Sequence, residues 1–200
     1  MQGLGMKSMN FHTNRFQIPN IGRSYQIMEG LVFVGGLESG IYCILLLMQI
    51  TLAHIGNRGG KNDAFDGIVC DYLKRCIGLA QCITEAFRSE KALLDWVERQ
   101  RGRTRAVVLM LDARGRQMTS EALAAWLGKQ RDEGAQHIVF AVGPADGWSE
   151  AAREEGLRRG GLLSLGPMTL AHQLARLVMA EQIYRACTIL TGHPYHRGHS

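Results

Sequence analysis

From Met48 to about Leu190, short apolar runs alternate with amphipathic segments, and this alternation limits the fold more than any other feature of the chain. The apolar runs suit strands, and they cover residues 48–55, 81–87, 105–112, 136–142 and 162–165. The amphipathic segments have helical spacing, and they cover 64–77, a stretch opening at Ser89, 120–131, 149–159 and 170 to about 190. Strands that alternate with helices predict an α/β fold with a mostly parallel sheet and helices on both of its faces.

The run 105–112 is the clearest strand of the set. It is continuously apolar, as expected for a strand buried on both faces, so we expect it at the centre of the sheet. Ser89 is the expected N-cap of one helix, and Thr119 or Ser120 that of the next, because their hydroxyls can accept a hydrogen bond from a free backbone N–H.

Residues 1–47 have few charges and no sustained period of either kind. We therefore expect an N-terminal extension with little order over 1–47 and one domain over 48–200. The apolar run 41–54 is shorter than the ~20 residues that a membrane span needs, and it contains Gln49 and His54. We expect no membrane association, although a tether through 41–48 remains an alternative.

Composition limits the partners and the compartment. The formal net charge of +5 and a sequence pI near 9.1 favour an anionic partner such as nucleic acid. The cysteines are odd in number and form no Cys-x-x-Cys pair, which argues against a disulfide framework and against a zinc site. We expect a reduced, cytoplasmic setting in which each cysteine is a small buried apolar residue. These cysteines are Cys43, Cys70, Cys76, Cys82 and Cys187.

Two strand ends carry residues suited to ligand binding. Gly143 and Gly147 follow the run 136–142, and glycines there let the backbone approach a ligand closely at the carboxyl edge of a parallel sheet. Asp112 ends the run 105–112, where it could hold an adenine or a ribose. An ordinary strand-to-helix turn at 143–147 and a capping role for Asp112 remain alternatives.

The last helix and the tail are rich in titratable groups. His172, Arg176 and Arg185 are interspersed among apolar helix positions, which suits a helix that packs on a partner and also meets anions. The tail then carries Tyr195, His196 and Arg197. Its histidines are three residues apart, but Pro194 and Gly198 disfavour the regular helix that would align them, so we expect no metal site. A tail without fixed structure is the other interpretation.

Taken together, these segments resemble the bacterial SPOUT-class 23S ribosomal RNA (pseudouridine-N3)-methyltransferases. The resemblance runs from Met48 to about His199 and is specific over residues 109–115, 143–147, 165–173, 180–186 and 189–197. It implies a SPOUT methyltransferase fold with a C-terminal trefoil knot, S-adenosylmethionine as cofactor, and a homodimer whose interface includes the last helix. The implied substrate is 23S rRNA within the assembled 70S ribosome.

The resemblance also implies a cofactor site held largely by backbone groups. By position, its residues are Leu111, Gly143, Leu165, Gly166, Pro167, Met168, Thr169 and Leu170. The chain departs from the family at Pro144, where a second glycine is usual and one N–H is lost, and at Ala171, where proline is common.

Methyl transfer to an imide nitrogen requires a proton to be removed and a developing negative charge to be stabilised. Arg197 is the candidate for the charge, His196 for the base, and Tyr195 for stacking or hydrogen bonding to the acceptor base. His172 and Arg176 follow the cofactor stretch and are further candidates. In a dimer, the tail of one subunit could face the cofactor of the other.

Basic side chains could contact RNA phosphates. The candidates are Lys74, Arg75, Arg99, Arg101, Arg103, Arg105, Arg158 and Arg159, each of which could equally be a solvated surface charge. Two other functions remain open at this point. One is a SPOUT methyltransferase that acts on transfer RNA, and the other is a non-catalytic ribosome-binding protein, for which Pro144 is the hint.

Overall fold

The computed structural model describes residues 14–17, 24–28, 31–35, 43–46, 48–56, 64–76, 80–100 and 105–197, with side chains described from Met48 to Tyr195 within those ranges. The chain divides into two compact units, Met1–Leu47 and Met48–Ser200.

The first unit contains four short strands in an antiparallel sheet of order β1-β2-β3-β4. They are β1 (Asn14–Gln17), β2 (Ser24–Met28), β3 (Leu31–Gly35) and β4 (Cys43–Leu46). The sequence pattern did not predict these strands, and the expectation of little order over 1–47 stays a prediction.

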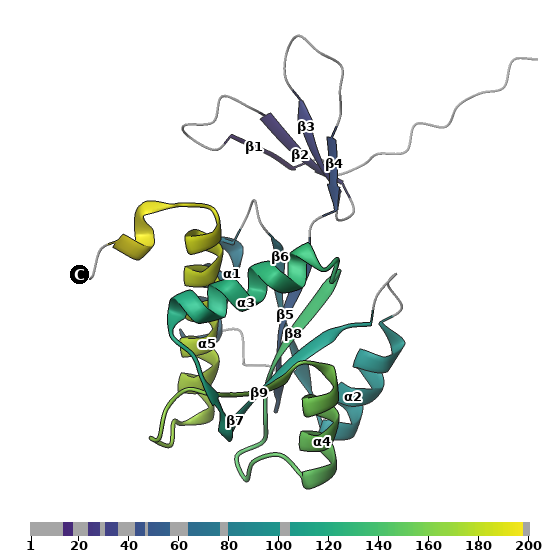
Figure 1. Ribbon diagram of the computed structural model, residues 1–200, viewed down its shortest axis with the longest axis vertical. Coiled ribbons are helices and arrows are strands. Elements are labelled where there is room, and N and C mark those ends of the chain that lie inside the picture. The colour runs from purple at the N-terminus through teal and green to yellow at the C-terminus, as the bar shows by residue number, and fades with distance from the viewer. Residues whose placement is uncertain are drawn as a thin grey trace, which may run out of the picture. The chain divides into compact units, whose positions relative to one another are not determined.

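The second unit is built on a five-stranded sheet of order β6-β5-β8-β7-β9, in which every pairing is parallel (Figure 1). Its strands are β5 (Met48–Ile55), β6 (Ala80–Phe87), β7 (Val107–Gln117), β8 (His137–Val142) and β9 (Gly161–Ser164). Its helices are α1 (Ala64–Lys74), α2 (Glu90–Arg99), α3 (Ser120–Asp132), α4 (Glu150–Arg159) and α5 (His172–Leu190), followed by a 3-10 turn, η1 (Pro194–Arg197). The predicted α/β fold with a parallel sheet is confirmed.

Helices cover both faces of this sheet, as predicted. Along β8, Ile138 and Phe140 point into a core shared with α1, α3 and α5, whereas Val139 and Ala141 point into a core shared with α2 and α4. This alternation follows from the two-residue period of a strand, and it explains why β8 is apolar at nearly every position.

Two N-caps, Ser89 and Thr119, match their sequence prediction, and Ser149 caps a third helix that was predicted without a cap. The hydroxyls of Ser89, Thr119 and Ser149 each accept a hydrogen bond from the backbone N–H three residues later. The last helix instead begins at His172, after Ala171, which offers no side-chain cap.

The expectation that 105–112 forms the central strand is wrong. The centre is β8, which is buried at all of its positions, and β7 lies between β8 and the edge strand β9. β7 also extends to Gln117, beyond the apolar run. It pairs with β9 over two separate stretches, 109–111 and 116–117, and the pairing is irregular between Leu111 and Arg116. At Gly115 the two backbones come so close that a Cβ would lie 2.5 Å from the amide nitrogen of Leu163. Only glycine fits this crossing. The trefoil knot stays a prediction.

The apolar run 41–54 contributes to strands β4 and β5 over its described residues. Within the part of the chain that the structure describes, no helix has the length and apolar character needed to cross a membrane.

A buried histidine in the central strand gives the stability a pH dependence. His137 accepts or donates a hydrogen bond at 2.9 Å with the Thr51 hydroxyl, and burial lowers the pKa of His137 below its ordinary value of 6.5. The unfolded chain therefore takes up this proton at a higher pH than the folded chain does. We therefore expect the free energy of unfolding to decrease as the pH drops below about 6.5, and to stop decreasing once the pH is below the pKa of His137 in the folded protein. Urea unfolding at a series of pH values across this range measures the free energy of unfolding.

His137→Gln should flatten this pH dependence without abolishing it, since the pKa of His172 is also lowered and contributes with the same sign. An unchanged slope in His137→Gln would show that the histidine does not remain neutral in the folded state.

Candidate functional site

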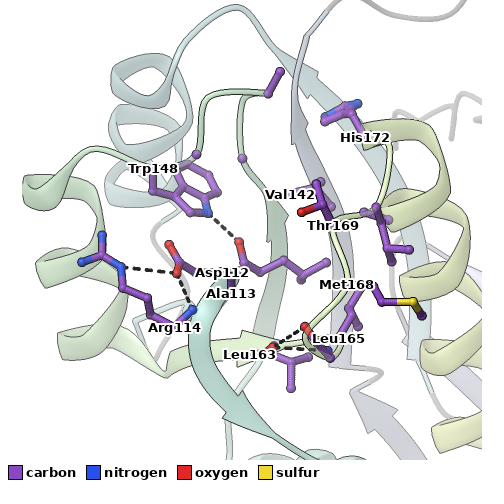
Figure 2. Close-up of a pocket in the computed structure, with 18 of the residues that line it drawn as sticks. Asp112, Ala113, Arg114, Val142, Trp148, Leu163, Leu165, Met168, Thr169 and His172 are labelled. Carbon is purple, nitrogen blue, oxygen red and sulfur yellow. Dashed lines mark hydrogen bonds and ion pairs between the residues drawn. The ribbon is translucent and has the colours of Figure 1, made fainter.

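A cavity of about 350 Å³ opens at the carboxyl ends of β8 and β9, beside the part of β7 where its pairing with β8 ends (Figure 2). The loops after β8 and β9 form it together with residues 111–114 of β7, and the first turn of α5 closes one side. Such an edge of a parallel sheet is where α/β folds commonly bind ligands, because the loops that leave neighbouring strands meet there. The walls combine apolar side chains, backbone groups and a few charged side chains.

The structure brings together all eight residues predicted to bind a cofactor. The set comprises Leu111, Gly143, Leu165, Gly166, Pro167, Met168, Thr169 and Leu170. Six of them are consecutive and belong to the loop between β9 and α5, while Leu111 lies within β7 and Gly143 directly follows β8. Their role in binding a cofactor stays a prediction.

Trp148 fixes the wall formed by Gly143 and Leu111. Its side chain is buried, and its indole N–H donates a hydrogen bond of 2.9 Å to the carbonyl oxygen of Leu111 (Figure 2). A Cβ on Gly143 would lie 2.8 Å from the indole ring, so glycine is required here by close packing. One aromatic ring therefore holds two parts of the wall in place.

The loop 143–147 is a tight turn in which the Gly147 N–H donates to the Pro144 carbonyl at 3.0 Å. Gly147 has a φ of +83°, a conformation that glycine adopts without strain. Pro144 lies at the start of this turn, where its missing N–H costs no hydrogen bond of the turn. The segment 143–147 is therefore an ordinary turn and also part of the cavity wall, so the two predictions made for it do not exclude each other.

The loop after β9 bends sharply. The Ser164 hydroxyl bonds both to the N–H and to the carbonyl of Gly166, each at 3.2 Å, and Gly166 has a φ of +122°. Beyond this bend Met168 is 79% exposed although it lines the cavity. The exposed apolar surface of Met168 is available for contact with a ligand or with a partner.

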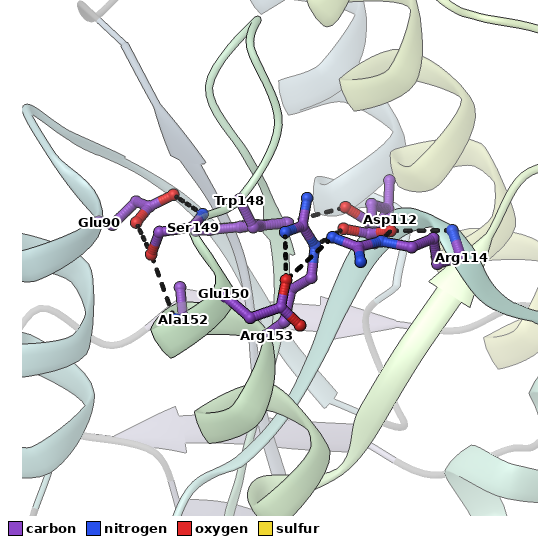
Figure 3. A network of polar contacts seen from close by, with 9 residues as sticks. Glu90, Asp112, Arg114, Trp148, Ser149, Glu150, Ala152 and Arg153 are labelled. Atoms are coloured by element: carbon purple, nitrogen blue, oxygen red, sulfur yellow. Dashed lines mark hydrogen bonds and ion pairs between the residues drawn. The ribbon is translucent and has the colours of Figure 1, made fainter.

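Asp112 is committed to a polar network beside the cavity (Figure 3). One carboxylate oxygen accepts the backbone N–H of Arg114 at 2.8 Å, and the other accepts the Arg153 guanidinium at 2.6 Å. Burial alone would raise the pKa of Asp112, but these two bonds outweigh it and lower the pKa. The capping interpretation of Asp112 is thus confirmed, and Asp112 also lines the cavity.

Glu150 and Glu90 extend the same network. Glu150 accepts hydrogen bonds from Arg114 and Arg153 at 3.3 and 3.2 Å. Glu90 of α2 accepts from the backbone N–H and the hydroxyl of Ser149 at 2.8 and 2.6 Å, which joins α2 to the start of α4 (Figure 3). The two arginines of the cavity wall, Arg114 and Arg153, are thus paired with the carboxylates of Asp112 and Glu150.

His172 lies at the edge of the cavity on the first turn of α5 (Figure 2). Its ring centroid is 5.7 Å from that of His54, at the end of β5. Burial, and then the charge of Arg176, lower the pKa of His172, so its ring is neutral at pH 7. Within the described residues, its buried Nε2 atom has no hydrogen-bond partner.

Arg176 does not line the cavity. Its side chain is buried, and its guanidinium forms an ion pair with Asp66 of α1. It contacts α1 and influences His172 electrostatically, which makes it a positioning residue rather than a group that meets a ligand.

Arg176→Gln tests this role. We expect it to lower the free energy of unfolding by about 2 kcal/mol, because Asp66 loses its partner while still three-quarters buried. We also expect the pKa of His172 to rise, because the cationic neighbour that lowers it is gone. Urea unfolding and a proton NMR titration of the imidazole measure the two effects. Arg131→Gln, which breaks an exposed pair with Asp132, should cost less than about 0.5 kcal/mol. A constant His172 pKa would contradict the assignment.

Tyr195 packs on the far part of α5. Its ring centroid is 4.7 Å from that of Tyr184, the Arg185 guanidinium lies 5.1 Å from its ring centroid, and its hydroxyl donates to Glu181 at 3.3 Å. Burial and the Glu181 carboxylate raise the pKa of Tyr195 to about 12. Along α5, Tyr184 is about 18 Å from His172 at 1.5 Å per residue. Tyr195 and His172, two of the predicted catalytic residues, are therefore not brought together within one chain.

The backbone of His196 and Arg197 belongs to η1, and their side chains lie outside the described part of the structure. Of the predicted phosphate contacts, Arg101 and Arg103 also lie outside it. Arg158 and Arg159 pair with Glu155, and Arg159 also with Glu98. The exposed remainder consists of Lys74, Arg75, Arg99 and Arg105.

Sequence reasoning missed Trp148, Arg114 and Arg153 as parts of the cavity wall. Trp148 follows Gly147 directly, and a large aromatic residue next to a glycine-containing turn was the available signal. The two arginines gave none, because an arginine in a turn or on a polar helix is usually solvated.

Comparison with known proteins shows the family of the chain that forms this cavity. A family model described as a predicted SPOUT methyltransferase matches residues 48–196. The ribosomal RNA large subunit methyltransferase H of Koribacter versatilis is 43% identical over 152 residues, which are 76% of this chain and all of that protein. The protein of the same name from Pelobacter propionicus is 53% identical over 91 residues, 46% of this chain and 57% of its own length.

Among solved structures, a probable rRNA-methyltransferase from Porphyromonas gingivalis aligns with a TM-score of 0.43 and 15% identity, over 90% of this chain and 87% of that one. The family assignment depends on the sequence matches, which extend from the first strand of the parallel sheet to the tail. The chain belongs to the SPOUT methyltransferase family.

Proposed function

We propose that this protein transfers a methyl group from S-adenosylmethionine to N3 of a pseudouridine in 23S rRNA of the assembled ribosome. The observation that carries the proposal is the cavity at the carboxyl ends of β8 and β9, beside β7, whose wall contains the complete predicted cofactor set. The family membership and the two relatives named for large-subunit rRNA methylation support the reaction and the class of substrate.

The residues of the cavity fit this cofactor. A volume of about 350 Å³ lies within the range of small-molecule sites. Leu111, Leu165 and Leu170 offer apolar surface for a planar base, and the bends at Gly143 and Gly166 leave backbone groups near the cavity without intervening side chains. When bound, S-adenosylmethionine supplies an activated methyl group on a positively charged sulfur.

The charges around the cavity also fit a cationic ligand. Arg114 and Arg153 are both paired with carboxylates, and His172 is neutral at pH 7 because its pKa is lowered. The wall thus presents no uncompensated positive charge from these three side chains. A site for a phosphate-rich ligand would instead leave its arginines without carboxylate partners.

The tail supplies the acceptor side of the proposed reaction. The raised pKa of Tyr195 keeps its hydroxyl protonated at neutral pH, so it acts as a hydrogen-bond donor or stacking surface and not as the base. His196 is the proposed base for the N3 proton, and Arg197 the proposed partner of the charge that develops on the flanking carbonyl groups. Most of the rate should come from holding the two partners in line.

A homodimer is part of the proposal because Tyr195 and the cavity lie against opposite halves of α5. A second copy that packs along α5 could bring its tail to the cavity of the first. Leu174 and Val178 support this arrangement, because they are exposed apolar side chains four residues apart on one face of α5. Met168, from the cavity loop, is exposed as well. A cytoplasmic location follows from the ribosomal substrate.

The test incubates the protein with isotopically labelled S-adenosylmethionine and three substrates in parallel: unmodified 70S ribosomes, naked 23S rRNA and transfer RNA. We expect label only on the ribosomes, in a nucleoside identified by mass spectrometry as N3-methylpseudouridine. Label in uridine or on a ribose oxygen would overturn the assignment. Label in transfer RNA would favour the other SPOUT activity, and ribosome binding without transfer would favour a non-catalytic role.

A further inference from the structure

Three cysteines that are distant in sequence converge in the core of the second unit. Cys76 lies two residues after α1, Cys82 is in β6 and Cys187 is in α5. Their Sγ atoms all lie within 4.8 Å of one another. The fold, and not a sequence motif, creates this group, which is why a search for paired cysteines misses it.

The three thiols are free and enclosed. Cys76 and Cys187 are 2% and 4% exposed, and Cys82 is half-buried on the edge strand. A cavity of about 90 Å³ reaches two of them, since both Cys76 and Cys187 line it together with Tyr184 and His193. The group therefore has a route by which a small ion could arrive.

The spacing of the sulfur atoms suits one shared ion. Metal–thiolate bonds are about 2.3 Å long, so three sulfurs around one ion in a plane are about 4 Å apart. A cluster with separations of up to 4.8 Å needs only a small contraction to reach this geometry. A disulfide would use two of the sulfurs and leave the third unexplained.

Metal binding at this cluster would release protons. The Cys76 thiol donates a hydrogen bond to the Tyr72 carbonyl at 3.6 Å. Metal ions bind the thiolate form of cysteine, so an ion that enters the cluster displaces the thiol protons.

We propose that Cys76, Cys82 and Cys187 bind one soft, thiophilic metal ion through three sulfur ligands. Among the described residues, no histidine or carboxylate belongs to the cluster, so a tetrahedral zinc site with four protein ligands is not present there. Three thiolates in a largely apolar site favour an ion that accepts three-coordinate sulfur, Cu(I) above all. Such an ion would connect α1, β6 and α5 next to Tyr184, on which Tyr195 packs.

The test titrates the reduced full-length protein with Cd(II), whose bonds to thiolates absorb in the ultraviolet, and with Cu(I) in the presence of a competing chelator. We expect one ion per chain and an increase in thermal midpoint. Cys82→Ser should weaken binding of either ion at least about a hundredfold. Cys70→Ser is the matched control, because Cys70 lies on α1 outside the cluster, and it should bind normally.

A second measurement does not depend on the folding of a variant. Alkylation of the wild-type protein, run long enough for opening of the fold to label the buried thiols and read by mass spectrometry, should show the labelling of Cys76, Cys82 and Cys187 slowed together by one equivalent of Cd(II), with Cys70 still labelled at its original rate. The proposal fails if Cd(II) leaves the labelling of the three cysteines unchanged, if Cys82→Ser binds as tightly as the wild type, or if Cys70 is protected equally.

Discussion

A chain that ends at Thr191 is expected to bind S-adenosylmethionine with unchanged affinity and to lose methyl transfer by about a thousandfold. The reason is the separation along α5. Tyr195 packs on Tyr184 and Arg185, one half of the helix away from the cavity beside His172. Removing the tail therefore removes the groups proposed to act on the acceptor base, whose acid–base contribution is typically 10²–10⁴-fold, and leaves the wall of the cavity intact. Calorimetry and the labelled-methyl assay separate the two effects.

The control deletes only residues 198–200, which leaves η1 whole and should cost little activity. Full turnover by the chain that ends at Thr191 would remove the tail from the proposed mechanism.

The same truncation can reveal whether each active site draws on two copies of the chain. In the proposed homodimer, mixing the truncated chain with a Gly143→Val chain gives heterodimers in which one site has both an intact cavity and an intact tail if the tail acts across the dimer. At S-adenosylmethionine concentrations too low to saturate Gly143→Val, each variant alone has little activity, and we expect activity to return in the mixture. Activity that stays absent in a mixture shown to contain heterodimers would mean that the tail serves its own chain.

Gly143→Val is expected to weaken the binding of S-adenosylmethionine by about a hundredfold, or about 2.7 kcal/mol. A Cβ at this position would lie 2.8 Å from the Trp148 ring, which is buried and cannot swing outward. The indole would have to move, which breaks its hydrogen bond to the Leu111 carbonyl and displaces a second part of the wall. Isothermal titration calorimetry on the purified variant measures the affinity.

Gly67→Ala is the matched control for a changed glycine. A Cβ there meets nothing within 4 Å, and the residue lies on the exposed face of α1. Alanine should leave the affinity unchanged and stabilise the helix by up to ~1 kcal/mol. If Gly143→Val binds the cofactor normally, the side of the cavity formed by Trp148 is not part of the site.

Most of the fold could be predicted from local patterns. Helix starts at Ser89, Thr119 and Ser149 depend on a hydroxyl three residues before a free N–H, and this interaction is visible in the sequence. The position of each strand in the sheet could not be predicted in the same way. β7 and β8 both contain continuous apolar runs and both have a neighbouring strand on each side, and only the tertiary arrangement places β8 at the centre with every position buried.

The residues of the candidate site also fall into two groups, those that a sequence motif could predict and those that only tertiary packing brings together. Residues 165–170 are consecutive, so one motif of the family resemblance could predict them together, and the same resemblance supplied Leu111 and Gly143. Arg176 looks in the sequence like any exposed helix cation, and its burial depends on Asp66, more than one hundred residues away along the chain. The meeting of Cys76, Cys82 and Cys187 likewise depends on the packing of three elements.

The position of Trp148 has a practical consequence. The chain contains three tryptophans, and the other two pack elsewhere, Trp96 near Phe87 and His137, and Trp126 near Phe140. Trp148 alone among them borders the cavity. In a Trp96→Phe, Trp126→Phe background, the intrinsic fluorescence of this one indole would serve as an optical sensor for ligands that enter the cavity, with no label attached to the protein.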